Sequence, residues 1–365
     1  MEFTDKESRQ IKEELTEIEQ TRILPPSILD IIYQKKLFKF ISQSLGGRAM
    51  DLPNALRIFQ ETSSIDGNLG WAVTIGAGGG MFSPCFKEDV AKDSFSPENA
   101  VIAGSGFPGG KAVKMENGYH VNGEWKFCSG SPYATIFTAN CIVENEGNSR
   151  ILSFILNPDQ VEIMNDWNAF GLVGTSSHSI KVSNQFVPAE RTFSIGEKMN
   201  NFEEVVHQFP FVPFSEASFA SVVLGIGKNF LDHVKMYIEK NKHRWGQGDF
   251  DKYQLVTRKW KTEMERWNNA ERHFHRMIDH VWQDHLKGKP LAAETLEDFS
   301  LVCKKAASTV LTCAQNLFRY MGMEMIMQHT ELNRIWRDLH TAAQHAFLIP
   351  YQENETIAYE INGEK

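Results

Sequence analysis

The chain has 365 residues, 42% hydrophobic and 23% charged, so it is long enough to bury a substantial core across two or three subdomains. Its net charge of −8, with no long basic run, argues against nucleic-acid binding, because a phosphate backbone attracts the opposite sign. No apolar run approaches the roughly 18 residues of a membrane span, and the charged start MEFTDKESRQIKEEL lacks the apolar stretch of a secretory signal, so we expect a cytoplasmic protein. The five cysteines are never spaced as CxxC, which indicates buried thiols rather than disulfides or a zinc site.

Helical patterns fill the first 83 residues. ESRQIKEELTEIEQT comes first, PSILDIIYQKKLFKFISQSL follows a Pro25-Pro26 break, and DLPNALRIFQETSSIDGNLGWAVTIG follows a Gly46-Gly47 stop. Apolar residues recur at helical spacing in each of the three stretches. We therefore predict an N-terminal helical domain over residues 1–83.

The central segment, 84–200, has a different pattern. It contains stretches rich in β-branched and aromatic residues, namely GYHVNGEWKF, ATIFTANCIV, RILSFIL and HSIKVSNQFV. Two Asn-Gly pairs, at 117–118 and 122–123, are expected to supply the positive φ angles of tight turns. GSGFPGG at 104–110 contains G-x-G-x-x-G, but strand-like alternation follows it where a dinucleotide site needs a helix, so we expect a loop. The segment predicts a central antiparallel β domain.

Long helical patterns return over residues 201–365. They are FASVVLGIGKNFLDHVKMYIEKN, FDKYQLVTRKWKTEMERWNNAERHFHRMIDHVWQDHLKG, LEDFSLVCKKAASTVLTCAQNLFRYMG and a last stretch that holds WRDLHTAAQH at 336–345. The second helix carries several histidines but no H-E-x-x-H pair, so we expect no metal site. The order of the three segments predicts an α+β fold, in which a β domain precedes a C-terminal four-helix bundle.

Four segments, taken in order and spacing, resemble the acyl-CoA dehydrogenase superfamily. They are GYHVNGEWKFCSGSPYA, WNAFGLVGTSSHSIKVSNQFVP, NKHRWGQGDFDKYQLV and LNRIWRDL. The resemblance covers nearly the whole chain and implies a flavin cofactor that lies along the strand ending in WKFCSG. A flavin ring needs an apolar face and polar groups along its edge. An aromatic wall, the Ser129 hydroxyl and exposed backbone N–H groups around Gly130 are expected to supply both.

The resemblance assigns a larger set of residues to flavin binding, namely Ser105, Phe127, Cys128, Ser129, Gly130, Ser177, His178 and Lys242. Lys242 stands where the family has an arginine that meets the distal phosphates of FAD, and YMGMEM replaces a Gly-Gly turn near the adenine. Both changes argue against tight FAD binding. We therefore expect FMN or FAD, loosely bound and supplied in the reduced state.

The catalytic carboxylate of many acyl-CoA dehydrogenases matches Ala346, so that base is absent at its usual position. GEWKFCSG, GTSSH and WRDLHTAAQH resemble instead the flavin-dependent monooxygenase branch, whose members take reduced flavin from a separate reductase. The C-terminal histidine of that branch matches His345, which we predict to be catalytic. An imidazole that titrates near neutral pH can both accept and donate a proton.

Helical geometry is consistent with this assignment. At 100° per residue, Arg334, Asp338 and His345 fall within about 40° of one another, whereas His340 points roughly 120° away from Arg334. We expect Arg334 and Asp338 to form an i, i+4 ion pair that anchors the helix together with Trp336.

The leading interpretation is a monooxygenase that acts on a small aromatic or amine substrate. The first alternative is an acyl-CoA dehydrogenase whose base is displaced, for example to Glu263 or Glu265, and the second is a non-catalytic ligand-binding relative. The resemblance implies a homotetramer, and four tryptophans in the long helices are too many for a purely solvated face: Trp245, Trp260, Trp267 and Trp282.

Overall fold

The start of the chain is helical, as predicted, in a computed structural model that describes residues 2–145, 148–247 and 251–350. The helices are α1 (Asp5–Thr21), α2 (Pro26–Gln34), α3 (Leu52–Ile65) and α4 (Gly67–Gly78), followed by the 3-10 segment η2 (Gly79–Cys85) and by α5 (Glu88–Phe95). Side-chain caps explain where three of them begin, because Thr4, Asp51 and Asp66 accept hydrogen bonds from backbone N–H groups of the first turns.

A seven-stranded sheet follows. Its strands are β1 (Ile102–Met115), β2 (Gly118–Cys128), β3 (Ile136–Asn145), β4 (Asn148–Leu156), β5 (Glu162–Ile163), β6 (His178–Pro188) and β7 (Thr192–Phe193), in the order β5-β6-β2-β1-β3-β4-β7. The four predicted strand stretches are confirmed as β2, β3, β4 and β6. The sheet is mixed rather than antiparallel, because β1 pairs with β3 in parallel.

Two local predictions for this sheet are wrong. GSGFPGG is not a loop but part of β1, where the register with β3 shifts between Ser105 and Gly110. The bulge accommodates the glycines and Pro108 within the strand. Of the two Asn-Gly pairs, Asn117-Gly118 lies at the β1–β2 turn and Asn122-Gly123 lies inside β2 at a register shift, and neither pair has a positive φ. Asn122-Gly123 therefore lies in a bulge of β2 and not in a second turn.

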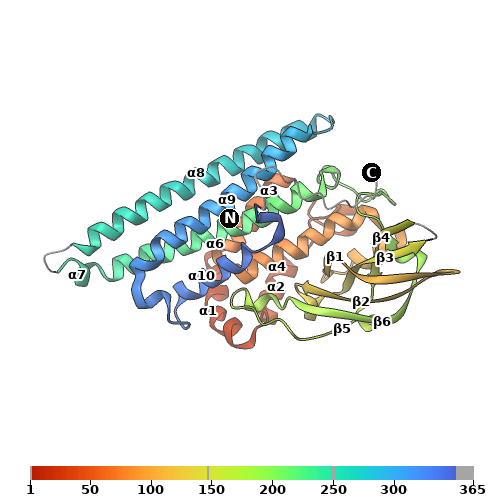
Figure 1. The fold of residues 1–365 in the computed structure, drawn as a ribbon, viewed down its shortest axis with the longest axis horizontal. Coiled ribbons are helices and arrows are strands. Elements are labelled where there is room, and N and C mark those ends of the chain that lie inside the picture. Colours follow the sequence, from red (N-terminus) through yellow and green to blue (C-terminus); the bar gives the residue numbers. More distant parts are fainter. Residues whose placement is uncertain (1, 146–147, 248–250, 351–365) are drawn as a thin grey trace.

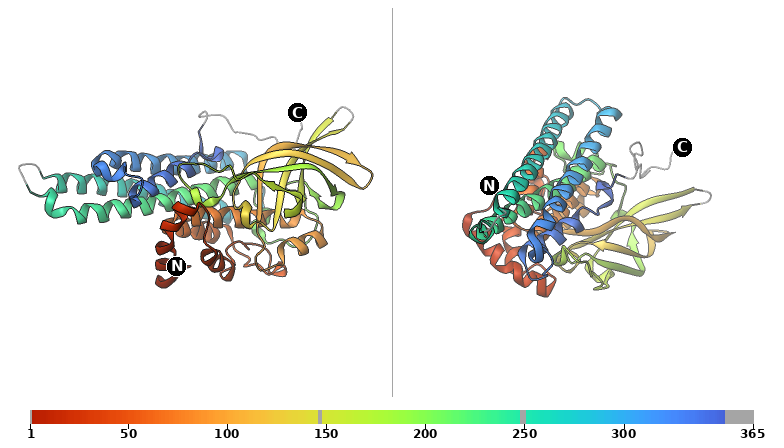
Figure 2. Two further views of the ribbon diagram at one scale, coloured as in Figure 1. Left: turned by 90° about the horizontal axis from the view of Figure 1, so that it is seen from below. Right: turned by 60° about the vertical axis from the view of Figure 1, so that its left-hand side comes forward.

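The C-terminal part forms the predicted bundle of long helices, which lie side by side in Figure 1 and extend away from the sheet. These helices are α6 (Phe211–Lys240), α8 (Lys252–Leu286), α9 (Ala293–Met321) and α10 (Glu331–Ala342), with the short α7 (Lys242–Trp245) at the far end. Figure 2 shows the sheet packed at the end of the bundle that lies opposite α7. The last fifteen residues of the predicted third domain, 351–365, lie outside the described part of the chain.

The N-terminal and C-terminal helices share one hydrophobic core. It joins side chains of α3 and α4 to those of α6, α8, α9 and α10, whereas the interior of the sheet has a separate core. Three of the four tryptophans cited for assembly, Trp245, Trp267 and Trp282, are buried in the core of the single chain, and the Trp260 indole donates to Leu231 O at 2.8 Å. The tryptophans therefore do not require a partner subunit.

Two expectations from composition match the structure. All five cysteines are buried with free thiols. Within the described residues, no helix is long and apolar enough to cross a membrane.

Candidate active site

The candidate site begins where β2 ends. The pairing of β2 with β6 shifts register between Trp125 and Cys128, and Phe127 within this irregularity has a φ of 64°. Positive φ is unfavourable for a bulky residue and recurs at functional sites. The irregularity turns the Phe127 side chain outward, where 69% of the residue is exposed, while Cys128 is buried in the core of the sheet. Burial also raises the pKa of Cys128 to about 12.

The Ser129 hydroxyl lies in a row of buried polar side chains. Its Oγ accepts a hydrogen bond from the Trp71 indole at 3.0 Å and lies 2.7 Å from Ser177 Oγ. Ser177 Oγ in turn lies 2.8 Å from Thr175 Oγ1, which donates to Leu172 O at 2.8 Å. The end of β2 is thereby joined both to α4 and to the loop that leads into β6.

The backbone N–H groups expected to face a flavin are used within the protein. Ser129 N donates to Phe127 O at 3.0 Å, and Gly130 N donates to Thr175 O at 2.9 Å. Gly130 has a φ of 77°, and a Cβ there would lie 2.9 Å from the Tyr133 ring. Gly130 therefore permits a sharp turn next to Tyr133, and Ser129 offers its side chain rather than its backbone N–H.

His345 lies in an aromatic cage next to Trp71. Its ring stacks on Phe219 of α6 with ring centres 3.6 Å apart, and it lies 6.0 Å from the Trp71 ring and 5.3 Å from Phe347. Trp71 therefore contacts both Ser129 and His345. The structure brings these two predicted residues into contact with one indole, although 216 positions separate them along the chain (345 − 129).

The position of His345 differs from the helical projection. α10 ends at Ala342, and His345 is the N-cap of the short 3-10 turn η9 (Ala346–Leu348). The helical projection, at about 100° per residue, therefore does not apply to His345. The turn after α10 directs the His345 ring toward Phe219. Ala346, which stands at the usual place of the dehydrogenase base, is the first residue of that turn.

The His345 ring is neutral at physiological pH. Burial among aromatic rings lowers its pKa to about 4, because a charged imidazolium loses its hydration there. This result corrects the expectation that His345 titrates near neutral pH. Nδ1 accepts a hydrogen bond from Phe347 N at 3.4 Å, so the single proton of the neutral ring is on Nε2. The chemically useful form of His345 is therefore a neutral N–H donor.

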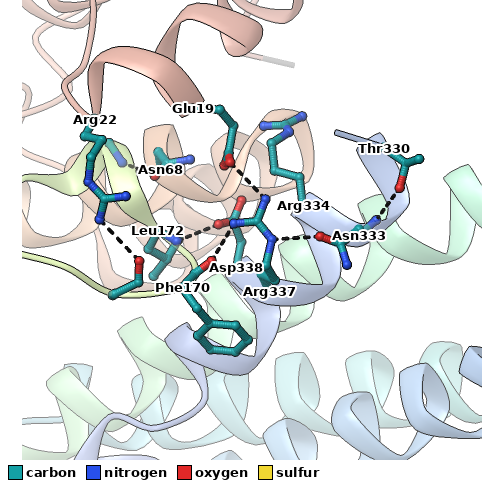
Figure 3. A network of polar contacts seen from close by, with 12 residues as sticks. Glu19, Arg22, Asn68, Phe170, Leu172, Thr330, Asn333, Arg334, Arg337 and Asp338 are labelled. Atoms are coloured by element: carbon teal, nitrogen blue, oxygen red, sulfur yellow. Dashed lines mark hydrogen bonds and ion pairs between the residues drawn. The ribbon is translucent and has the colours of Figure 1, made fainter. Parts of the chain in front are cut away.

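The loop between β5 and β6 is held from several elements, as Figure 3 shows. Arg22 at the end of α1 donates to the carbonyls of Trp167 and Ala169, and the Asn68 side chain accepts from Gly174 N at 2.8 Å. From α10, Arg337 donates to Phe170 O and pairs with Glu19 at 2.8 Å, while Asp338 accepts from Leu172 N. These contacts fix the loop that carries Thr175 and Ser177.

The ion pair of α10 differs from the predicted one. Arg334 Nη1 lies 2.7 Å from Asp66 Oδ2, at the start of α4, so the arginine pairs between helices rather than with Asp338 four residues on. Asp338 is 1% exposed, and its pKa is raised by burial and by the nearby Asp66 carboxylate, while Arg334 opposes that shift. α10 is thus joined to the helix that carries Trp71.

Trp336 and His340 form a separate contact on α10. Their ring centres are 4.1 Å apart, and the Trp336 ring also packs against Phe318 and Phe170. Trp336 Nε1 and His340 Nε2 are both buried with no hydrogen-bond partner among the described atoms. Burial lowers the pKa of His340, so it too is neutral.

The remaining predicted cofactor residues are dispersed. His178 Nδ1 accepts from Trp167 N at 2.9 Å, so that ring holds the loop before β6. Ser105 lies at the bulge of β1 and accepts from Phe107 N at 3.4 Å. Lys242 is the first residue of α7, which lies at the far end of the bundle in Figure 1, and its ammonium group lies over the Tyr253 ring, so it is not brought near Ser129 within one chain.

The residues at the end of β2 fit a flat ring that has polar atoms along one edge. Phe127 offers an exposed aromatic face, with Trp167 edge-on at 6.3 Å, and Ser129 offers a hydroxyl oxygen. A flavin has that combination of apolar face and polar edge. The residues that would hold it within one chain are Phe127, Ser129 and Trp71.

Comparisons with known proteins agree with this geometry. Residues 217–350 match the family described as acyl-CoA dehydrogenase, C-terminal domain. The chain is 24% identical to indole-3-acetate monooxygenase of Pseudomonas putida over 345 residues, which cover 93% of this chain and 88% of that protein. It is 23% identical to the oxygenase component of p-hydroxyphenylacetate 3-hydroxylase of Acinetobacter baumannii, with 93% and 83% covered. The fold matches XiaF from Streptomyces sp., solved in complex with FADH2 and glycerol, with a TM-score of 0.80, 22% identity and coverage of 94% and 93%.

The C-terminal part of the chain is thus similar to the acyl-CoA dehydrogenase C-terminal domain, and nearly the whole chain is similar to flavin-dependent monooxygenases. Sequence reasoning missed Trp71, Phe219 and Asp66. The first two lie in apolar helical stretches and resemble ordinary core residues, so no local signal distinguishes them. Asp66 carried a signal, because it caps α4, but the cap does not reveal that the second carboxylate oxygen meets Arg334.

Proposed function

We propose that this protein is a flavin-dependent monooxygenase that uses reduced FMN or FAD and O2 to hydroxylate a small aromatic or amine substrate. The observation that carries the proposal is the contact of both Ser129 and His345 with Trp71, at a site whose usual carboxylate position holds Ala346. When bound, reduced flavin supplies two electrons to O2, so that one oxygen atom enters the substrate and the other leaves as water. The residues of this chain would bind and orient the flavin and the substrate, and they would exclude water from the site.

Each residue has a defined task in this proposal. Ser129 and Phe127 would hold the edge and the face of the flavin ring, and Trp71 fixes the Ser129 hydroxyl through its indole N–H. His345 presents Nε2–H as a neutral donor, and its stacking on Phe219 fixes the direction of that N–H. A preorganised donor in a dry site stabilises developing negative charge far more than it would in water. His345 therefore acts on the reacting oxygen as a hydrogen-bond donor rather than as a charged acid.

A small aromatic substrate suits the surroundings of this site. A cavity of about 280 Å³ lies between η2 and the segment that enters α6. Its lining includes the aromatic side chains of Phe82, Phe209 and Phe211, and also the polar residues Lys198, Glu203, His207 and Gln208. Phe211 lies eight residues before Phe219 on α6, so roughly 12 Å of helix separates the cavity from the His345 cage. The names of the two relatives, which refer to indole-3-acetate and p-hydroxyphenylacetate, favour an aromatic acid over an amine.

Reduced flavin is expected to come from a separate reductase, which the description of one relative as an oxygenase component supports. To test the function, the purified protein is mixed with NADH, a generic flavin reductase and either FMN or FAD. Indole-3-acetate and p-hydroxyphenylacetate are then offered under isotopically labelled O2, and products are weighed by mass spectrometry. Incorporation of one labelled oxygen atom supports the proposal. Hydrogen peroxide as the sole oxygen product, across a panel of aromatic acids and amines, contradicts it.

The dehydrogenase alternative receives little support from the carboxylates on the long helices. Glu263 pairs with Arg266 at 3.1 Å and accepts from Asn316, and Glu265 is exposed on α8. Glu216 is a third carboxylate, three residues before Phe219 on α6, but it accepts from Ser300 at 2.6 Å and lies 3.5 Å from Lys304. Glu263 and Glu216 are thus paired with side chains other than His345, and Glu265 faces solvent. Failure of the protein to bind flavin in either redox state would favour the non-catalytic alternative.

We further propose that the protein is a homotetramer in the cytoplasm. Support for assembly comes from large apolar side chains that a single chain leaves exposed: Phe107, Phe127, Phe170, Met323 and Ile326. Lys242 begins α7, which lies at the opposite end of the bundle from the sheet, so a role of Lys242 in flavin binding would require a second copy of the chain. Light scattering that reports a stable monomer at micromolar concentration contradicts this assembly.

A further inference from the structure

The row of hydroxyls behind Ser129 has a defined direction. A carbonyl oxygen only accepts, so the 2.8 Å contact with Leu172 O uses the single hydroxyl proton of Thr175. Thr175 Oγ1 must then accept from Ser177, and Ser177 Oγ must accept from Ser129. The remaining member, the Trp71 indole N–H, only donates. Every proton therefore points from Trp71 through Ser129, Ser177 and Thr175 to Leu172.

This direction is enforced by burial. Ser129, Ser177 and Thr175 are each less than 8% exposed, so water does not replace a lost partner. Leu172 O also accepts from the Trp167 indole at 3.1 Å, which fixes its carbonyl in place. Reversal of the row would leave the Thr175 and Leu172 oxygens 2.8 Å apart with no proton between them, a repulsive contact between two acceptors.

The consequence for Ser129 is chemical. Its proton is used on Ser177 and one of its lone pairs on Trp71, so a single lone pair remains for a ligand. Ser129 can accept a further hydrogen bond but cannot donate one. A ligand edge at this position must therefore present an N–H or O–H group.

We infer that Ser177 and Thr175 set the redox-state preference of the site, because they hold the Ser129 hydroxyl as an acceptor that favours reduced over oxidised flavin. Reduction places a proton on a ring nitrogen that is a bare acceptor in the oxidised ring. At this position a reduced ring would present an N–H to the Ser129 lone pair, whereas an oxidised ring would present a second lone pair. This inference rests on the proposed flavin site and names two specificity-determining residues, neither of which needs to touch the flavin.

The test measures affinity rather than turnover. Dissociation constants of the full-length protein for oxidised and chemically reduced FMN and FAD are determined anaerobically by equilibrium dialysis. Ser177→Ala removes the acceptor of the Ser129 proton, and Thr175→Val removes the acceptor of the Ser177 proton. Either change frees the Ser129 hydroxyl to donate. We expect oxidised flavin to bind more tightly in both variants, so that the preference for reduced flavin falls about fivefold to tenfold, the effect of one net hydrogen bond.

Two controls separate this effect from structural damage. Ser131→Ala removes another buried hydroxyl at the same turn, which donates to Ser176 O at 3.1 Å and lies outside the row. Thr175→Ser keeps the donor to Leu172. Both should retain the wild-type preference. Damage to the site would weaken binding of both redox states, whereas the inference requires oxidised flavin to gain affinity.

The outcomes are distinct. Equal wild-type affinity for the two redox states, or an unchanged preference in both Ser177→Ala and Thr175→Val, overturns the inference even if the protein hydroxylates an aromatic acid. Absence of flavin binding in either state contradicts the proposed function itself.

Discussion

Replacement of His345 separates the two chemical roles that an imidazole can have in this site. His345→Ala removes a neutral ring that stacks on Phe219 at 3.6 Å and carries its proton on Nε2. Because burial lowers its pKa to about 4, no charge is lost at neutral pH. Loss of one preorganised donor typically lowers kcat about 10²–10³-fold, and we expect product formation to fall by that factor. Flavin affinity should remain nearly unchanged, and hydrogen peroxide release should rise as reduced flavin is oxidised unproductively.

The assay compares hydroxylated product, NADH consumption and hydrogen peroxide at saturating reduced flavin. His340→Ala is the matched control, because His340 is also a neutral, partly buried ring packed against an aromatic residue, at 4.1 Å from Trp336. We expect it to lose stability but little activity. His345→Gln retains an N–H donor and should recover at least about tenfold of the activity lost in His345→Ala, part of the donor effect.

The pH profile adds an independent check. With a pKa of about 4, His345 stays neutral as pH changes from 6 to 8, so this group should add no step to kcat/KM in that range. Equal losses in the alanine variants of His345 and His340, or normal turnover by His345→Ala, would refute the reasoning. Failure of His345→Gln to recover any activity, together with a step near pH 6.5, would restore the charged acid–base role.

Three further predictions concern stability and reactivity. Arg334→Met should lower the free energy of unfolding by about 3–5 kcal/mol in urea titrations, because Asp66 is left buried and unpaired; a loss below about 1 kcal/mol would argue against a structural role of the pair. The pKa values of His207, His275 and His345 are each lowered to about 4 by burial, so the unfolded chain binds protons below about pH 6.5 that the folded chain does not. Unfolding free energy should therefore fall by several kcal/mol from pH 7 to pH 5, up to roughly 2 kcal/mol per group, and equal urea midpoints at the two pH values would contradict this. Straight-chain acyl-CoA should not reduce bound FAD under anaerobic conditions, since loss of a general base costs about 10²–10⁴-fold; rapid bleaching of the flavin absorbance would favour the dehydrogenase alternative.

Much of the architecture follows from the sequence, because helix and strand periodicity record which face of an element is buried. The helical segments, four of the seven strands and the burial of the cysteines were predictable in this way. The order of the motifs also indicated the family that residues 217–350 match. Local pattern does not report which element covers a buried face, so the parallel pairing of β1 with β3 and the bulge at Ser105 were decided by the sheet as a whole.

For the candidate site, the sequence selected Ser129 and His345 as residue types with the right chemistry, but tertiary structure decided how each is used. Trp71 meets Ser129 across 58 positions and Arg334 meets Asp66 across 268, and no periodicity encodes contacts at such separations. The protonation state of His345 depends on the aromatic side chains that exclude water from it, which are dispersed along the chain. Sequence fixes the chemistry that a side chain has available, whereas its hydration and its partners, which select among those possibilities, exist only after packing.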